Sequence, residues 1–293
     1  MATVPTPLAS TTTSAHAPYL QAPLQDLAAW TRYFRDAQIP VLAKTSRALE
    51  VLRADQDNVD ASMLAATMEG DPLMTLKLLA YVAGQRRPGT FTETESVTTS
   101  LLMTGVAPFF RGFGLQATVE DHLHDQPAAL EGLRALLRRA ERAAHFAVGF
   151  AVHRGDTDVG PIRLAAFLHD FAEMLMWCHA PTLQLRITAA QRADPALRTV
   201  AVQRDVLHIE LDDLRQALMK LWHLPELLVR ISDDRHADQA IVRNVVLAVR
   251  LARHSTYGWD NPALPDDMEE IAQLLHVLPR VAQAYVHKID PTA

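Results

Sequence analysis

The residues of this chain best suited to chemistry are His145 and the adjacent pair His169 and Asp170, near its middle. Neutral imidazoles and a carboxylate are good ligands for a divalent cation such as Zn²⁺, Fe²⁺ or Mn²⁺. Burying either group without a partner is costly. The pair therefore either satisfies itself and nearby backbone groups or holds a ligand. A single histidine more often completes hydrogen bonds in a core than binds metal, so both interpretations stay open at this level.

The stretch that carries the pair, residues 161–179, has almost no polar face. This pattern is typical of a helix enclosed by other helices, so we expect one central helix here. His145 lies in a preceding long helix that the sequence predicts to begin at Pro127. The spacing between His145 and His169 suits two antiparallel helices joined by a short loop, an arrangement that brings the two imidazoles together.

The composition predicts an all-α protein. The chain has 293 residues, of which 49% are hydrophobic and 21% charged, and it contains only 11 glycines. Such a composition favours helices over strands and turns. The length allows one large domain or two modest ones, with a substantial core.

The charge balance argues against nucleic-acid and membrane-surface binding. The formal net charge is −6, and aromatic residues make up 6% of the chain. A general electrostatic attraction to phosphate and a set of stacking platforms are therefore both missing. Four arginines lie on the helix predicted after Pro127, namely Arg134, Arg138, Arg139 and Arg142. Because Glu131 and Glu141 share that helix, we interpret this basic stretch as a solvated face.

Cys178 is the only cysteine, which excludes an internal disulfide framework and a thiolate metal cluster. We expect this thiol to be buried and inert. The sequence has no apolar run long enough for a membrane span and no signal-peptide pattern. These features predict a soluble, cytoplasmic protein.

Along the chain we expect a flexible tail at residues 1–22, an N-terminal helical lobe at 23–118 and a second helical lobe at 119–293. The tail is rich in Thr, Ser, Ala and Pro and has no charged residue. The polar segment 118–126 separates the lobes. Within the first lobe, Asp71 followed by Pro72 is a helix start signal, with the aspartate as N-cap.

Over residues 39–277 the chain resembles the HDOD domains, signalling relatives of the HD phosphohydrolases in bacteria. This resemblance makes residues 22–290 one HDOD-type unit, a multi-helix HD-like bundle with an N-terminal helical lobe. In the N-terminal half it rests on Ile39 and Pro40, the run Gly70, Asp71, Pro72 and Leu73, the run Lys77, Leu78 and Leu79, and the helix end from Leu101 to Gly105. In the C-terminal half it rests on His145, on Leu168, His169 and Asp170, on the run Leu221, Trp222, His223, Leu224 and Pro225, and on His236.

Departures from the family pattern bear on the metal site that the resemblance implies. Leu211 stands where many relatives have a further histidine, and Arg235 stands where a histidine would precede His236. Ala172 replaces a glycine, and Ala83 and Gly84 replace an Asn-Ser pair. Active HD enzymes complete the metal shell with a late aspartate, at which position this chain has Arg253. Its fixed positive charge disfavours a cation, so we expect a degenerate site in which Arg253 pairs with Asp170.

The resemblance implies a non-catalytic regulatory protein of bacterial signal transduction that binds a protein partner or a small ligand and uses no cofactor. The alternative is a metal-dependent phosphohydrolase acting on nucleotides or cyclic dinucleotides. In that enzyme His145, His169 and Asp170 bind the metal, and His236 lies near the phosphate. The sequence contains no recognisable receiver, kinase or cyclase-like segment, so we expect the partner to be a separate signalling protein. The oligomeric state is not defined by the sequence.

Overall fold

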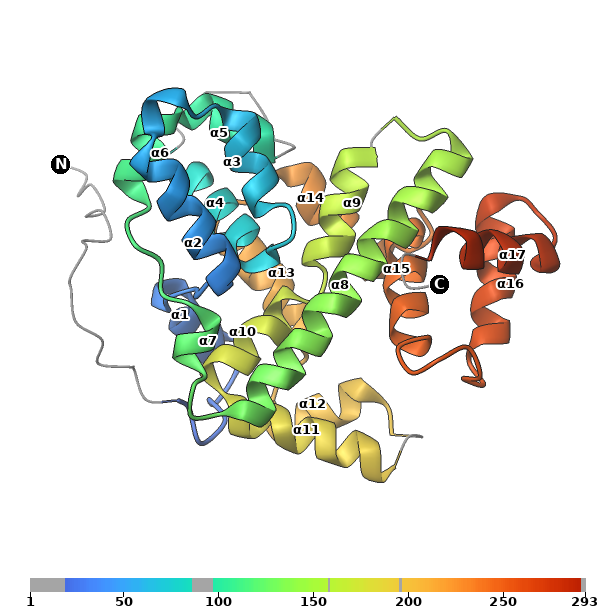
Figure 1. The fold of residues 1–293 in the computed structure, drawn as a ribbon. Coiled ribbons are helices and arrows are strands. Elements are labelled where there is room, and N and C mark those ends of the chain that lie inside the picture. The colour runs from blue at the N-terminus through green and yellow to red at the C-terminus, as the bar shows by residue number, and fades with distance from the viewer. Residues whose placement is uncertain (1–18, 86–96, 158, 195–196, 291–293) are drawn as a thin grey trace.

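The computed structural model describes residues 19–85, 97–157, 159–194 and 197–290 (Figure 1). Within these ranges the regular elements are helices and no β-strand occurs, which confirms the predicted all-α class. None of the described helices is long and apolar enough to cross a lipid bilayer. Residues 1–18 of the predicted tail lie outside the described residues. Tyr19, by contrast, donates a hydrogen bond to Asp125 (2.8 Å), so the end of that segment packs on the folded body.

The first seven helices of the described residues are α1 (Leu27–Asp36), α2 (Ala43–Ala54), α3 (Ala61–Met68), α4 (Pro72–Gly84), α5 (Val97–Thr104), α6 (Val106–Gly112) and α7 (Val119–His122). They are followed by α8 (Pro127–Arg154), α9 (Val159–Leu168), α10 (Phe171–His179), α11 (Pro181–Ala193), α12 (Thr199–Leu207), α13 (Leu211–Leu221), α14 (Glu226–Ile231), α15 (Ala240–His254), α16 (Leu264–Leu275) and α17 (Pro279–Ile289). Two short 3-10 helices are η1 (Gln56–Asn58) and η2 (Asp234–His236).

Helix α4 is shared by two hydrophobic cores. Its predicted start is confirmed, because the Asp71 carboxylate accepts a hydrogen bond from the Met74 amide (3.0 Å) and Pro72 begins the helix. One face of α4 contributes Leu73, Leu76 and Leu79 to the larger core, which also contains Trp30 and Phe34 of α1, and the opposite face contributes Met74, Leu78 and Val82 to the smaller core. The helix therefore lies between the two hydrophobic cores.

The segments around Val41 and Thr118 lie side by side and are bound to α4. The Val41 amide donates to the Ala117 carbonyl (3.0 Å), and the Val119 amide donates to the Val41 carbonyl (2.8 Å). Lys77 of α4 donates to the Ile39 carbonyl (3.0 Å) and to the Gln116 side chain (2.6 Å). Burial lowers the pKa of Lys77 to about 8, with the nearby Asp71 opposing the shift.

The central helix is α8, and the helix predicted over residues 161–179 is interrupted. Helices α9, α10 and α15 pack along α8 (Figure 1). The prediction of one continuous helix was wrong, because the chain ends α9 at Leu168 and begins α10 at Phe171. His169 and Asp170 form the turn between them, and the Asp170 carbonyl accepts a hydrogen bond from the Met174 amide (3.1 Å). The sequence pattern did not indicate this turn, because the residues on both sides of it are apolar.

Gly132 of α8 allows close packing against α10. A Cβ atom at this position would lie 2.5 Å from Cη2 of Trp177. The indole is only 3% exposed and is enclosed by the core, so it has little room to move. Replacement by alanine overpacks this contact.

We therefore expect Gly132→Ala to lower the free energy of unfolding by about 1–3 kcal/mol, as overpacked cores do. The control is Gly84→Ala at the exposed end of α4, because a Cβ atom at Gly84 meets no atom within 4 Å beyond its chain neighbours. That variant should be neutral or slightly stabilised, since alanine favours helices. Denaturant unfolding of both variants measures the difference, and equal stabilities would contradict this packing.

A second prediction concerns the alkaline range. Folded Lys77 loses its proton near pH 8 and its unfolded counterpart near pH 10.5, so between these values the unfolded state binds more protons. The free energy of unfolding therefore increases as the pH rises through this window, and Lys77 contributes on the order of 2 kcal/mol to the increase. Denaturant unfolding at a series of pH values should show wild type gaining stability over Lys77→Met. Parallel curves for the two proteins would refute the assigned pKa.

Candidate functional site

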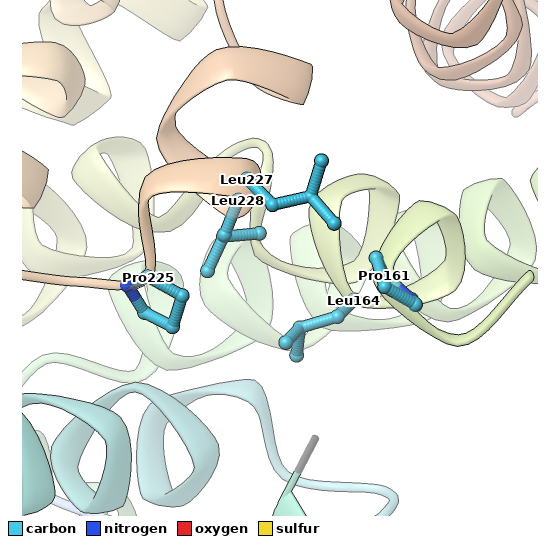
Figure 2. A pocket seen from close by; sticks show the side chains of 5 residues that line it. All are labelled: Pro161, Leu164, Pro225, Leu227 and Leu228. Atoms are coloured by element: carbon cyan, nitrogen blue, oxygen red, sulfur yellow. The ribbon is translucent and has the colours of Figure 1, made fainter. Parts of the chain in front are cut away.

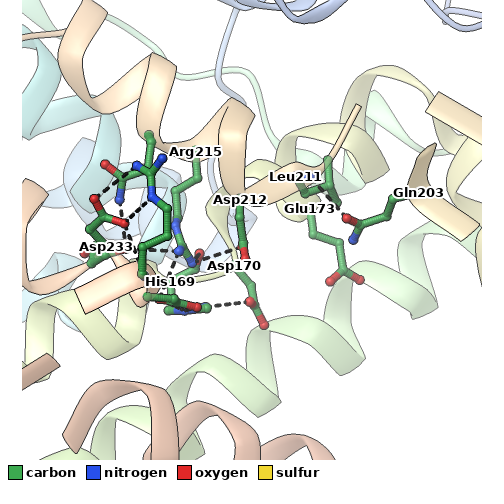
Figure 3. A network of polar contacts seen from close by, with 12 residues as sticks. His169, Asp170, Glu173, Gln203, Leu211, Asp212, Arg215 and Asp233 are labelled. Atoms are coloured by element: carbon green, nitrogen blue, oxygen red, sulfur yellow. Dashed lines mark hydrogen bonds and ion pairs between the residues drawn. The ribbon is translucent and has the colours of Figure 1, made fainter. Parts of the chain in front are cut away.

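The turn between α9 and α10 is the centre of a buried network of charged side chains, which we call the His169 cluster (Figure 3). Its members come from six parts of the chain. They are Arg139 of α8, His169 and Asp170 of the turn, Glu173 of α10, Arg215 of α13, Asp234 of η2 and Arg253 of α15. The side chains of His169 and Asp170 are 5% and 11% exposed.

The imidazole of His169 lies between two carboxylates. Its Nδ1 is 2.9 Å from Oδ1 of Asp170, and its Nε2 is 3.1 Å from both carboxylate oxygens of Asp234. Carboxylates only accept hydrogen bonds, and a neutral imidazole has one N–H. Both contacts are therefore satisfied at once only by the imidazolium. Burial and the charge of Arg215 lower the pKa of His169, but the two carboxylates outweigh them, so its pKa is raised.

The carboxylate of Asp170 is surrounded by cations. Nη2 of Arg139 lies 2.8 Å from its Oδ2, and Nη2 of Arg253 lies 3.7 Å from its Oδ1. Burial alone raises the pKa of Asp170, but Arg139, His169 and Arg253 together hold it well below its usual range. Arg139 also pairs with Glu173 at 3.0 Å. Asp170 is consequently ionised and fully engaged.

Arg215 joins the cluster to the loop that follows α14. Its side chain is 2% exposed. Nη1 donates to the His169 carbonyl (3.0 Å), and Nη2 donates to the Ser232 carbonyl (3.0 Å) and to Asp234 (3.1 Å). Burial raises the pKa of Asp234, but His169 and Arg215 lower it to about 2. The loop is thereby held against α13 and the turn.

The structure brings together three of the five residues predicted for the site: His169, Asp170 and Arg253. The predicted pairing of Arg253 with Asp170 is present, although Arg139 lies closer to that carboxylate. His145 is on the exposed face of α8, where its Nδ1 lies 2.9 Å from the carbonyl oxygen of Glu141. The side chain of His236 is 56% exposed and its Nε2 lies 3.9 Å from Asp233. No contact recorded for the described residues joins either histidine to the His169 cluster.

The interpretation of the α8 arginines as a solvated face was wrong for two of them. Arg139 is 19% exposed and bound in the cluster, and Arg142 is 10% exposed and paired with Asp290 at 2.6 Å. Arg138 does lie at the surface, where it pairs with Glu131. The error arose because the sequence displays only charges on the same helix, whereas the partners of the buried arginines come from distant elements.

Sequence reasoning also missed Arg215 and Asp234. Arg215 carried a signal, because it lies at helical spacing within the apolar stripe of Leu211, Leu214 and Leu218. A cation on such a face requires a buried partner. Asp234 carried none, since it follows another aspartate in a polar loop. Its role depends on the position of His169, which is far away in sequence.

The residues of the cluster do not suit a divalent cation. Both ring nitrogens of His169 face carboxylates, and both oxygens of Asp170 face cationic groups. A metal ion would have to displace Arg139 and approach Arg253. Within the described ranges no group of three or more His, Cys, Asp or Glu side chains is placed to hold a metal ion.

An apolar crevice lies between α9 and α14 (Figure 2). It is lined by Pro161, Leu164, Pro225, Leu227 and Leu228. The crevice is too narrow to admit a water molecule. It does not provide a ligand pocket in this conformation.

Two solved structures have a similar fold. The MmoQ response regulator from Methylococcus capsulatus is 20% identical, with a TM-score of 0.57 over 81% of this chain and 98% of that one. A virulence factor from Campylobacter jejuni is 16% identical, with a TM-score of 0.59 over 91% of this chain and 97% of that one. At these identities the likeness concerns the fold alone. A comparison with curated proteins found no match.

The sequence itself carries the family assignment. The HDOD domain model matches residues 39–237, which is more than half of the chain and includes the His169 and Asp170 turn. The all-α architecture agrees with that match. The chain belongs to the HDOD domain family.

Proposed function

We propose that this chain is a regulatory protein of bacterial signal transduction that acts by binding and catalyses no reaction. The observation that supports the proposal is the state of Asp170. Its charge is balanced by two guanidinium groups and an imidazolium, in the turn where the HD phosphohydrolases bind metal. The coarse assignment to signalling rests on the HDOD family match.

The contacts within the His169 cluster support the proposal that the chain does not hydrolyse phosphoesters. A metal-dependent hydrolase uses its cation to polarise the phosphoryl oxygen and to generate hydroxide at neutral pH. In this cluster the donors that would hold such a cation are bound to protein cations. An imidazolium cannot act as a metal ligand or a general base. We therefore propose that His169 has a structural role, because an imidazolium has no free nitrogen lone pair to accept a proton.

In this proposal the chain transmits its signal by binding another molecule. We propose a separate signalling protein in the bacterial cytoplasm as the partner, with a small ligand as the second possibility. The negative net charge disfavours nucleic acid as that partner. No cofactor is needed for such a role.

The competing function is the metal-dependent phosphohydrolase, and metal analysis with turnover assays separates the two. The purified protein should contain no stoichiometric metal after incubation with Mn²⁺, Fe²⁺ or Zn²⁺, and should not hydrolyse nucleotides or cyclic dinucleotides. Asp170→Ala is the control for any residual turnover. Tightly held metal together with turnover that Asp170→Ala abolishes would establish the hydrolase.

Stability measurements test whether Arg139 has the structural role assigned to it. Arg139→Met leaves Asp170 and Glu173 without their nearest cation, and breaking a buried pair in this way costs about 3–5 kcal/mol. Arg138→Met is the matched control, one residue away on α8, because its pair with Glu131 is exposed and should contribute about 0–1 kcal/mol. Chemical denaturation compares the two variants. Equal losses would mean that the cluster does not depend on Arg139.

A further inference from the structure

The C-terminal unit, α16 and α17, packs against the end of α15 and against α8 (Figure 1). It lies beyond residues 39–237, the part of the chain that the HDOD domain model matches. The last turn of α15 carries Arg253, which reaches Asp170 in the His169 cluster. The contacts between the C-terminal unit and this turn therefore bear on the cluster.

Asp267 of α16 forms the first anchor. Its carboxylate is 2% exposed and lies 2.6 Å from Nε of Arg250 and 2.6 Å from Nδ1 of His254. These two residues flank Arg253 on the last turn of α15. A single buried carboxylate thus holds that turn on both sides of the cluster arginine.

Asp290, directly after α17, forms the second anchor. Its carboxylate is 1% exposed and binds Arg142 of α8 through two hydrogen bonds, of 2.9 and 2.6 Å. Nη1 of the same guanidinium donates to the Ser255 carbonyl (2.9 Å), two residues after Arg253. The rings of Phe146 and Trp259 lie 5.3 and 5.4 Å from this guanidinium carbon. The end of α17 is thereby connected through Arg142 to the end of α15.

Arg253 itself does little to fix its own position. Its side chain is 43% exposed, and its contact with Asp170 is 3.7 Å long. An ion pair of this length and exposure contributes little to stability. The two anchors are shorter and more deeply buried, and removing one partner of a buried pair is costly. The anchors therefore determine where the turn, and with it Arg253, is held.

We infer that the C-terminal unit sets the charge balance of the His169 cluster by holding Arg253 beside Asp170. Release of α16 and α17 withdraws one of the positive charges that neutralise this carboxylate. The inference goes beyond the proposed function, because it concerns what positions Arg253 and not what the chain binds. The inference gives the C-terminal unit a role in the His169 cluster, although this unit lies outside the residues that the HDOD domain model matches.

Arginine-selective labelling tests the inference in the full chain. Asp267→Asn and Asp290→Asn each weaken one anchor while keeping the side-chain shape. Phenylglyoxal labelling mapped by peptide mass spectrometry should show Arg253 reacting several-fold faster in each variant than in wild type. Arg235, whose side chain is 65% exposed and pairs with Asp233, is the internal control and should keep its rate.

Amide hydrogen exchange supplies the second measurement. The Ser255 amide donates to the Leu251 carbonyl (3.0 Å) and the Thr256 amide to the Arg253 carbonyl (3.3 Å), so both should exchange faster in the two variants. Asp212→Asn is the control variant, because Asp212 is 57% exposed and lies on α13 beside Arg215. This control variant should change neither the labelling rate of Arg253 nor the exchange rate of the Ser255 amide.

Unchanged labelling of Arg253 in the anchor variants would overturn the inference. If Asp267→Asn fails to fold, Asp290→Asn alone decides, since the two anchors act through different contacts. The outcome is separable from the proposed function. Metal binding and turnover are measured on the wild-type protein, whereas this test reads the position of one arginine.

Discussion

The structure of the site depends on one constraint, which is that a carboxylate buried at the turn between two core helices must be neutralised. Asp170 is 11% exposed, and its oxygens are met by Arg139 from α8, by Arg253 from α15 and by the adjacent His169. Each cation needs its helix at a defined distance from the turn. The packing of α8 and α15 around α9 and α10 and the charge balance of the cluster are therefore two aspects of one arrangement. His169 extends it to Asp234 and so to Arg215 of α13.

The same solution recurs along α8. Arg139 and Arg142 are one helical turn apart, and each leaves the helix surface to meet carboxylates supplied from elsewhere in the chain. Buried ion pairs of this kind contribute less to net stability than well-packed apolar groups of the same size, but losing one partner is severe. They hold helices in a specific register. The binding role that we propose for this chain would benefit from such fixed geometry.

The sequence was sufficient for the fold class, for the N-cap at Asp71 and for the burial of residues 161–179, because each depends on local composition or period. It also indicated that Arg253 faces Asp170, through the family resemblance. It did not reveal the break at His169 and Asp170, since the residues on both sides are equally apolar. Arg139, Arg215 and Asp234 were missed because a buried charge is defined by partners from distant elements. Of these, only Arg215 disturbed a local pattern.

Anomalous X-ray diffraction tests most clearly whether the turn at His169 and Asp170 binds a metal ion. Crystals grown with millimolar Mn²⁺ and measured at the manganese absorption edge would locate any bound ion by its anomalous signal. We expect no anomalous peak within coordination distance of His169 and Asp170, with Arg139 and Arg253 still beside the carboxylate. An anomalous peak there, with Arg139 displaced from Asp170, would contradict this expectation.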